Sequence, residues 1–151
     1  MLFRSPAIFS HSSARALVDV PRNVPDHVLT LLAKNNGICM VAFVSDFVSE
    51  EFAQWSRDKD KKDPGVPPIV TVEHVADHIE HIREVAGINH VGIGADFDGA
   101  PDMPVGLNDV STYPLLMDTL TNRGWSLPEL EQLRSGNILR VLREAEEVAA
   151  K

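Results

Sequence analysis

The sequence predicts an α/β fold in which short parallel strands alternate with helices that pack outside them. Three apolar runs have the length and composition of buried strands: residues 6–9, 38–43 and 90–95. Segments with helical spacing of apolar residues separate these runs, at 25–35 and 71–87, and helices follow the third run. This alternation is typical of parallel strands joined by helical crossovers. Three strands form a small sheet, whose faces would stay partly uncovered unless further strands existed.

Length and charge limit the classes of protein to consider. A chain of 151 residues suits one domain. Its 22 acidic residues outnumber its 14 lysines and arginines, and the formal net charge is −8. Proteins that bind nucleic acids usually present a basic face, so we expect no nucleic-acid partner.

The chain also lacks sequence signals for a membrane. No stretch approaches the ~20 apolar residues of a membrane span. The first ten residues carry only a short apolar run, interrupted by Arg4 and Pro6, which argues against a signal peptide. The last residues, EAEEVAAK, lack the hydrophobic tail of a lipid-anchor signal. We therefore expect no span, leader or anchor in these residues, and the localisation stays open.

Cys39 is the single cysteine and lies in the middle of the second apolar run. One cysteine allows no internal disulfide. No neighbouring residue in the sequence would lower the pKa of its thiol, as a reactive cysteine requires. We expect Cys39 to be a small core residue.

Start and stop signals define the longer helices. Thr71 can begin a helix that Gly87 can end. Ser126 and Glu129 have the spacing of a capping box, with a proline in the first turn. We also expect a helix over 113–122 and a break in the last helix near 135–136.

A polar stretch at 50–68 separates the second apolar run from the following helix. It contains a cluster of charges and ends in a segment rich in proline and glycine. Blocks of charge are usually solvated. The sequence therefore predicts an exposed insertion here.

Three histidines lie along the predicted helix 71–87, at 74, 78 and 81. Spacings of three and four residues can present two imidazoles to one metal ion. However, Val75 occupies the position at which the H-E-x-x-H zinc motif requires glutamate. We expect ordinary surface or packing roles for all three.

Polar residues follow the predicted strands at the point where each strand ends. His11 follows the first strand, and Asp96 and Asp98 follow the third; Ser45 and Asp46 after the second are a weaker case. In parallel α/β folds, functional groups gather at the carboxyl ends of the strands. The two aspartates are therefore candidates for a site at this edge.

Each candidate also has a purely structural alternative. Asp98 and Gly99 form a common turn pair. Asp96 and His11 could each cap or terminate a turn, and Arg22 could be an ordinary surface arginine. The residues alone do not decide between these interpretations.

A second enzyme class fits the stretch that ends in Asp96-Phe97-Asp98-Gly99. In phosphatases of the haloacid dehalogenase type, a strand leads into D-x-D-G. Those enzymes begin with that strand and need a nucleotide-binding type of domain after it. Here only about a third of the chain follows, and it is mostly helical, so this alternative is the weaker one.

Four segments together resemble a known family: FSHSSAR at 9–15, PRNVPDHVL at 21–29, VADHIEHIREVAG at 75–87 and VGIGADFDGAP at 91–101. In order and content they are similar to the carboxyl-terminal part of membrane (renal-type) dipeptidases. These are zinc metallopeptidases of the amidohydrolase-like TIM-barrel group. The resemblance implies a partial (β/α)8 barrel over 1–151: about the last three strands with their helices, followed by carboxyl-terminal helices.

The resemblance also implies an activity and a role for three residues. In the family, two zinc ions bridged by a carboxylate and a hydroxide cleave dipeptides, and the hydroxide attacks the dipeptide carbonyl. His11 matches the last zinc-ligating histidine. Arg22 matches the arginine that binds the terminal carboxylate of the substrate. Asp96 matches the aspartate that handles the proton and binds the substrate amine. Family members often form dimers, so a homodimer is possible.

The other zinc ligands of the family belong to an amino-terminal portion that has no counterpart here. A catalytic zinc site needs about three protein ligands, whereas this chain offers one matching imidazole. Ala42 is a further departure, because relatives often have asparagine there. The sequence thus leaves open a catalytically inert fragment, an incomplete gene model, or a chain that needs a partner to supply the front strands.

Overall fold

This computed structural model describes residues 5–58 and 65–150. Strands, α-helices and short η helices follow one another along the chain in this order: β1 (Ile8–Phe9), α1 (Asp26–Lys34), β2 (Ile38–Val41), α2 (Ser45–Val48), α3 (Glu50–Asp58), α4 (Val72–Ala86), η1 (Ile88–His90), β3 (Val91–Ile93), η2 (Val110–Thr112), α5 (Tyr113–Asn122), α6 (Leu127–Glu131), η3 (Gln132–Gly136) and α7 (Asn137–Ala149).

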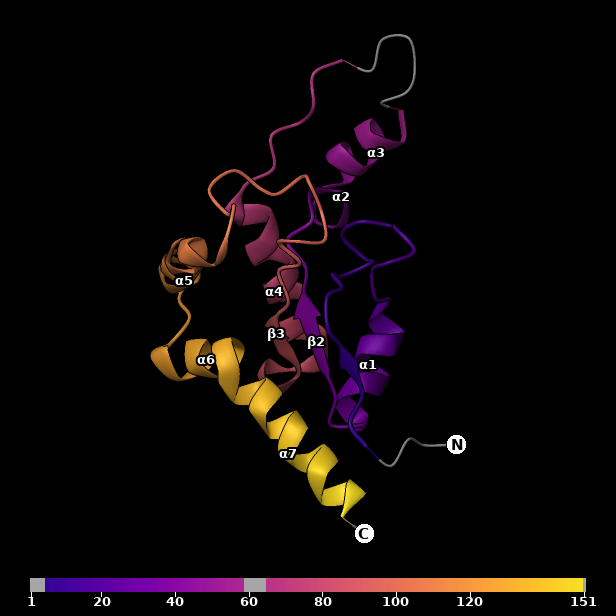
Figure 1. Cartoon of the computed structure of the whole chain (residues 1–151), viewed down its shortest axis with the longest axis vertical. Coiled ribbons are helices and arrows are strands. Elements are labelled where there is room, and N and C mark those ends of the chain that lie inside the picture. The colour runs from indigo at the N-terminus through magenta and orange to yellow at the C-terminus, as the bar shows by residue number, and fades with distance from the viewer. Residues whose placement is uncertain (1–4, 59–64, 151) are drawn as a thin grey trace.

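The three strands form a parallel sheet in the order β1-β2-β3, which confirms the predicted α/β fold. Ile8 pairs with Ile38, and Cys39 pairs with Val91. Figure 1 shows the arrowhead of β2 pointing toward the end of the molecule that carries α2 and α3. The carboxyl ends of the strands therefore lie at that end, which we call the rim.

Helices α1 and α4 cover one face of the sheet and pack against each other. Paired residues of neighbouring parallel strands share a face; Cys39 and Val91 belong to the buried core, and Phe9 packs against it. Cys39 is fully buried, and burial raises the pKa of its thiol to about 12. The predicted core role of Cys39 is confirmed.

The predicted helix signals are confirmed at both ends of α4 and at the start of α6. Thr71 caps α4 in a capping box with His74, and Gly87 ends it at φ 93°. Ser126 and Glu129 form the capping box of α6. The expected break near 135–136 is a π-helical segment, η3, through which the chain continues into α7.

The structure corrects the expected exposed insertion at 50–68. Residues 50–58 form α3 rather than a loop, and its Phe52 and Ala53 are buried in the core. Two apolar residues among many charges are sufficient to attach one side of a short helix, while the charges remain in solvent. Residues 65–67 are exposed as predicted, and 59–64 lie outside the described residues.

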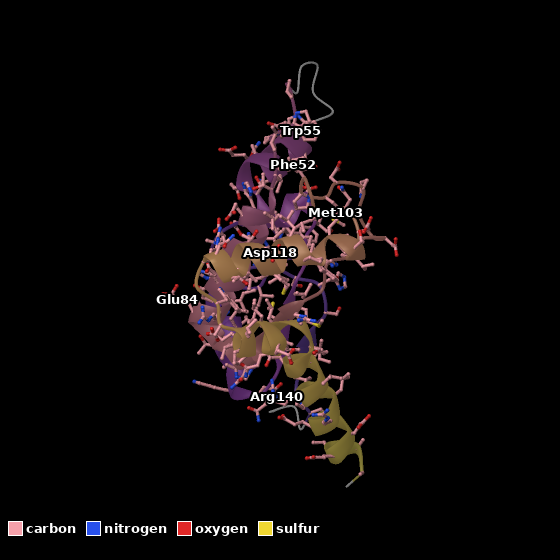
Figure 2. All side chains as sticks on the ribbon, turned by 90° about the vertical axis from the view of Figure 1, so that its left-hand side faces the viewer. Phe52, Trp55, Glu84, Met103, Asp118 and Arg140 are labelled. Carbon is pink, nitrogen blue, oxygen red and sulfur yellow. The ribbon has the colours of Figure 1, made fainter. Side chains whose placement is uncertain are left out.

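Helix α7 holds the opposite end of the sheet, where the strands begin. The buried Asn137 donates from Nδ2 to the carbonyl oxygens of Ile88 (2.6 Å) and Val91 (2.9 Å). Arg140 donates to the carbonyl oxygens of Asn36 and Asn89. Figure 2 shows Arg140 far from Phe52 and Trp55, which lie beyond the rim. Helix α7 thus covers the starts of β2 and β3.

Candidate functional site

Backbone hydrogen bonds continue beyond the ends of the strands. They hold the segments that follow the three strands side by side at the rim. Ser12 donates to the carbonyl oxygen of Met40 at 2.9 Å, and Phe43 donates to that of Ala95 at 3.0 Å. His11 precedes the first of these contacts and Asp96 follows the second. The two residues therefore lie at the same end of the sheet, as the sequence predicts.

The loop after β1 folds back so that Arg22 returns toward His11. Val24 donates to the carbonyl oxygen of Ser13 at 2.8 Å, and Arg15 donates to that of Val24 at 3.0 Å. His11 and Arg22 consequently line one hollow of about 510 Å³ beside β1. The structure brings these two predicted site residues together.

The buried Asn23 closes this loop with three hydrogen bonds to the backbone. Its Oδ1 accepts from the Ser13 N–H at 3.1 Å. Its Nδ2 donates to the carbonyl oxygens of Val18 (2.9 Å) and Phe47 (2.8 Å). The side chain is 3% exposed. We conclude that Asn23 positions its neighbour Arg22 by fixing the loop.

Replacing Asn23 by alanine is expected to lower the free energy of unfolding by about 2–3 kcal/mol, because three buried backbone groups lose a partner. Asn23→Asp should cost at least as much, since a carboxylate oxygen would then face the carbonyl oxygens of Val18 and Phe47. Urea titration of each variant measures the change. A loss below about 0.5 kcal/mol for Asn23→Ala would contradict the assigned role.

His11 is half-buried, and its Nδ1 lies 2.7 Å from the hydroxyl oxygen of Ser10. This contact orients the ring and leaves Nε2 as the nitrogen that can face a ligand. In metal sites, a hydrogen bond at one ring nitrogen commonly fixes the tautomer that coordinates through the other. His11 thus has the local geometry of a single imidazole ligand.

Arg22 is exposed, and its guanidinium lies over the ring of Phe47, 5.6 Å from the centroid. Stacking on an aromatic face orients the planar guanidinium and leaves its edge N–H donors directed outward. Two parallel N–H groups match the two oxygens of a carboxylate. The arrangement suits recognition of a carboxylate that enters the hollow.

Asp96 is half-buried in the segment that follows β3 and has φ 67°, in the left-handed region. A Cβ added to Gly99 would lie 2.2 Å from Asp96 Oδ1, so the turn packs closely on the carboxylate. Strained backbone of this kind often occurs at functional sites. Asp96 shares the rim with His11 and Arg22 but does not line their hollow. Asp98 is exposed in the turn, which confirms its alternative as a turn residue.

The three histidines of α4 have structural partners, in agreement with the sequence. His74 belongs to the capping box of α4. His81 Nε2 lies 2.8 Å from Asp26 Oδ1 and links α4 to α1. His78 is 1% exposed, and its Nδ1 accepts from the Ala14 N–H at 2.9 Å. His78 therefore fixes the loop that carries His11 and Arg22, a role that the sequence pattern does not indicate.

His78 should make the fold sensitive to acid. Burial lowers its pKa from 6.5 to about 4, and the Val48 backbone opposes this shift more weakly. The neutral ring is favoured in the folded state, so this stability is fully present above pH 6.5. It falls as the pH drops from 6.5 to 4, by about 3 kcal/mol in all. Urea titrations between pH 7 and 4 measure this loss.

The matched variant is His78→Gln, whose side-chain oxygen can still accept from the Ala14 N–H. We expect it to be less stable at pH 7 but to lose less stability between pH 6.5 and 4. An unchanged pH dependence in this variant would show that other groups cause the acid sensitivity.

The described residues do not form a metal site by themselves. Over 5–58 and 65–150, no group of three histidine, cysteine, aspartate or glutamate side chains is close enough to hold an ion. Since a catalytic zinc needs about three protein ligands, His11 fits the family's metal only as one member of a larger set. The described part of the chain also has no helix that is long and apolar enough to cross a membrane.

A family model described as membrane dipeptidase (peptidase family M19) matches residues 2–151. The chain belongs to this family. The match includes His11, Arg22 and Asp96, and it leaves the phosphatase alternative without support. The M19 assignment confirms the family that the sequence segments indicate.

Two curated relatives illustrate how much of an M19 protein the chain represents. Dipeptidase tcpJ of Claviceps purpurea is 45% identical over 146 residues, which are 97% of this chain and 31% of that protein. Dipeptidase 3 of Homo sapiens is 43% identical over 145 residues, which are 96% of this chain and 26% of that protein. The chain thus spans less than a third of either relative.

Two solved structures have the same fold. The match covers a larger share of each of these chains than of the two curated relatives, although less than half. A Rhodobacter sphaeroides metallopeptidase, liganded with a phosphinate mimic of the dipeptide L-Ala-D-Ala, matches with a TM-score of 0.79 and 28% identity. The match covers 93% of this chain and 36% of that one. The probable dipeptidase PvdM of Pseudomonas aeruginosa has a TM-score of 0.79 at 25% identity, covering 96% and 46%.

Proposed function

We propose that this chain supplies part of the active site of a metal-dependent dipeptidase. The observation that carries the proposal is the shared rim: His11 and Arg22 line one hollow, and Asp96 follows the third strand at the same end of the sheet. M19 membership and the dipeptide mimic bound by the Rhodobacter relative support it. We further propose that the three strands are the last three of a (β/α)8 barrel, whose sites lie at the carboxyl ends of the strands.

Each residue has a distinct task in this proposal. Arg22 binds the terminal carboxylate of the dipeptide with two parallel N–H groups. Asp96 binds the substrate amine and holds a proton at its carboxylate during hydrolysis. His11 contributes one ligand to the metal, which we propose to be Zn²⁺. The remaining ligands come from outside the described residues, which do not complete the set.

The same reasoning gives an expectation for the chain alone and for the complete enzyme. A rim with a single metal ligand is expected to be catalytically inert until the other strands are present. We also propose that the complete enzyme forms a homodimer, which light scattering of the purified enzyme tests.

A hybrid dipeptidase tests the proposed function. The hybrid is one polypeptide chain, in which residues 2–151 of this protein replace the matched segment of the Claviceps purpurea relative. We expect it to hydrolyse L-Ala-D-Ala. Arg22→Lys should raise KM more than it lowers kcat, since lysine lacks the planar pair of donors. Arg143→Lys, at an exposed position on α7, is the control. A folded, metal-loaded hybrid without activity, or one indifferent to Arg22→Lys, would overturn the proposal.

A further inference from the structure

Two glycines flank Asp96 in the sequence, at positions 94 and 99. We infer that both are positioning residues of the dipeptide site: Gly94 allows the ends of β1 and β3 to lie in contact, and Gly99 leaves room for the Asp96 carboxylate. The inference rests on the proposed function, because it concerns how the chain places the groups assigned there. The physical reason is that glycine has no Cβ, so other atoms can approach its backbone closely.

Gly94 lets the end of β1 reach the end of β3, although β2 lies between these two strands in the sheet. A Cβ at Gly94 would overlap the carbonyl oxygen of Ser10 and would lie 3.0 Å from Met40 Cβ. Both atoms belong to the backbone or are bonded directly to it, so they cannot rotate away. Ser10 directly precedes His11, and Gly94 lies two residues before Asp96. A side chain at position 94 would therefore separate the proposed metal ligand from the proposed acid–base group.

Hydrogen bonds to β2 hold the backbone on both sides of this contact. Gly94 donates to the carbonyl oxygen of Val41 at 3.0 Å, and Ser12 donates to that of Met40 at 2.9 Å. Each of these bonds joins one outer segment to the residues of β2 that lie between them. Relief of a clash at position 94 would therefore stretch at least one of the two bonds and move the end of β1 or of β3.

Gly99 closes the turn after β3 and lies against the Asp96 carboxylate. The Gly99 N–H donates to the carbonyl oxygen of Asp96 at 3.1 Å. A Cβ at Gly99 would overlap Asp96 Oδ1 and would lie 2.9 Å from Cγ and 3.2 Å from Oδ2. These three nearest atoms all belong to one carboxyl group. An alanine would thus push the Asp96 side chain into another orientation, a change that the fold tolerates but a catalytic group does not.

The packing of Phe97 keeps the turn from shifting as a whole. The centroid of its ring lies 5.7 Å from that of Phe43 and 5.6 Å from that of Tyr113. Phe43 is fully buried, so this contact fixes the residue that follows Asp96. A methyl group added at position 99 would consequently displace the carboxylate rather than the backbone.

Space, and not an unusual backbone conformation, is what these two glycines provide. Neither Gly94 nor Gly99 has a positive φ, so alanine is compatible with the backbone at both positions. Gly92 is the matched control, because it lies on the same face of β3 as Gly94. A Cβ at Gly92 would meet Ile38 Cδ1 at 2.9 Å and Met40 Cγ at 3.2 Å, which belong to flexible side chains that can rotate.

Alanine substitutions in the hybrid dipeptidase test the inference. Misplacing a catalytic group by about 1 Å can cost about 10²-fold in rate, so we expect Gly99→Ala to lower kcat/KM by about 10- to 100-fold without changing the affinity for zinc. Gly94→Ala should lower kcat/KM to a similar extent and also weaken zinc binding by about tenfold, because it displaces His11. Gly92→Ala should retain both properties. Chelator competition measures the zinc affinity, and urea titration verifies that each variant folds.

A double substitution separates positioning from a general structural effect. Because Gly99 acts through the Asp96 carboxylate, Gly99→Ala should lower kcat/KM by less than about twofold in a hybrid that already carries Asp96→Asn. A merely structural role of Gly99 would give the same loss in both backgrounds.

The outcomes distinguish this inference from the proposed function. An active hybrid in which Gly99→Ala keeps more than half of kcat/KM, or loses equally in both backgrounds, would overturn the inference and leave the proposed function intact. A folded Gly94→Ala variant with unchanged activity and zinc affinity would overturn the assignment of Gly94. An inactive unsubstituted hybrid would contradict the proposed function, and this inference with it. Gly99 is exposed, so its result decides the inference even if Gly94→Ala does not fold.

Discussion

Replacing Asp96 by asparagine is expected to lower kcat/KM of the hybrid dipeptidase by about 10²- to 10⁴-fold, the usual contribution of a general acid or base. Asparagine has nearly the same shape as aspartate but cannot hold the proton as a carboxylate does. It also loses the charge that attracts the substrate amine. The measurement is steady-state hydrolysis of L-Ala-D-Ala.

The fold should tolerate this change, which makes the result interpretable. Asp96 has φ 67°, and asparagine adopts the left-handed region at least as readily as aspartate. We therefore expect an unchanged free energy of unfolding. The matched control is Asp98→Asn, two residues later in the exposed turn, which should retain activity. An Asp96→Asn hybrid with more than a tenth of the original kcat/KM would contradict the proposed role.

Replacing Phe43 by alanine is expected to lower the free energy of unfolding by about 3–5 kcal/mol. Phe43 follows β2 and is fully buried. Its ring packs edge-to-face against Phe97, with centroids 5.7 Å apart, and against Tyr113 at 5.9 Å. Removing it leaves a cavity and also frees Phe97, the neighbour of Asp96. This loss is a large fraction of the stability of an ordinary domain.

Urea titration of the 151-residue chain measures this effect. Phe43→Leu should lose less, because leucine fills part of the cavity. Leu31→Ala, at a side chain 59% exposed on α1, should change stability by no more than about 0.5 kcal/mol. Equal effects of Phe43→Ala and Leu31→Ala would show that the packing around Phe43 does not stabilise the fold.

The sheet and its main helices could be predicted because their signals are local. Continuous apolar runs define β2 and β3, and the signals at Thr71 and Gly87 fix the ends of α4. The order of elements then implies parallel strands, since helical crossovers return the chain to the same edge of the sheet. Their parallel direction in turn places His11 and Asp96 at one rim.

Other features depend on contacts between distant residues and have no local signal. Helix α3 forms in a charged segment because Phe52 and Ala53 find a place in the core. His78 resembles a surface histidine in the sequence, yet its ring nitrogen accepts from the backbone N–H of Ala14, 64 residues earlier. The contacts of Asn23 with Val18 and Phe47 are equally invisible in the sequence.

The candidate site is predicted in part. The strand pattern indicates His11 and Asp96, but Arg22 follows only from the family resemblance. The structure then shows how the closed loop brings Arg22 into the hollow with His11. Asp96 shares the rim without lining that hollow. In the proposed barrel, the wall between these groups is completed by strands that the chain does not contain.

The most direct test is to measure zinc content and L-Ala-D-Ala hydrolysis for the 151-residue chain alone and for the hybrid dipeptidase. We predict far less than one zinc ion and no turnover for the chain alone. The hybrid should bind zinc and hydrolyse the dipeptide, and Asp96→Asn should lower its kcat/KM by about 10²- to 10⁴-fold. Stoichiometric zinc and turnover in the isolated chain, with the turnover lost in Asp96→Asn, would contradict the conclusion that a single metal ligand is insufficient for catalysis.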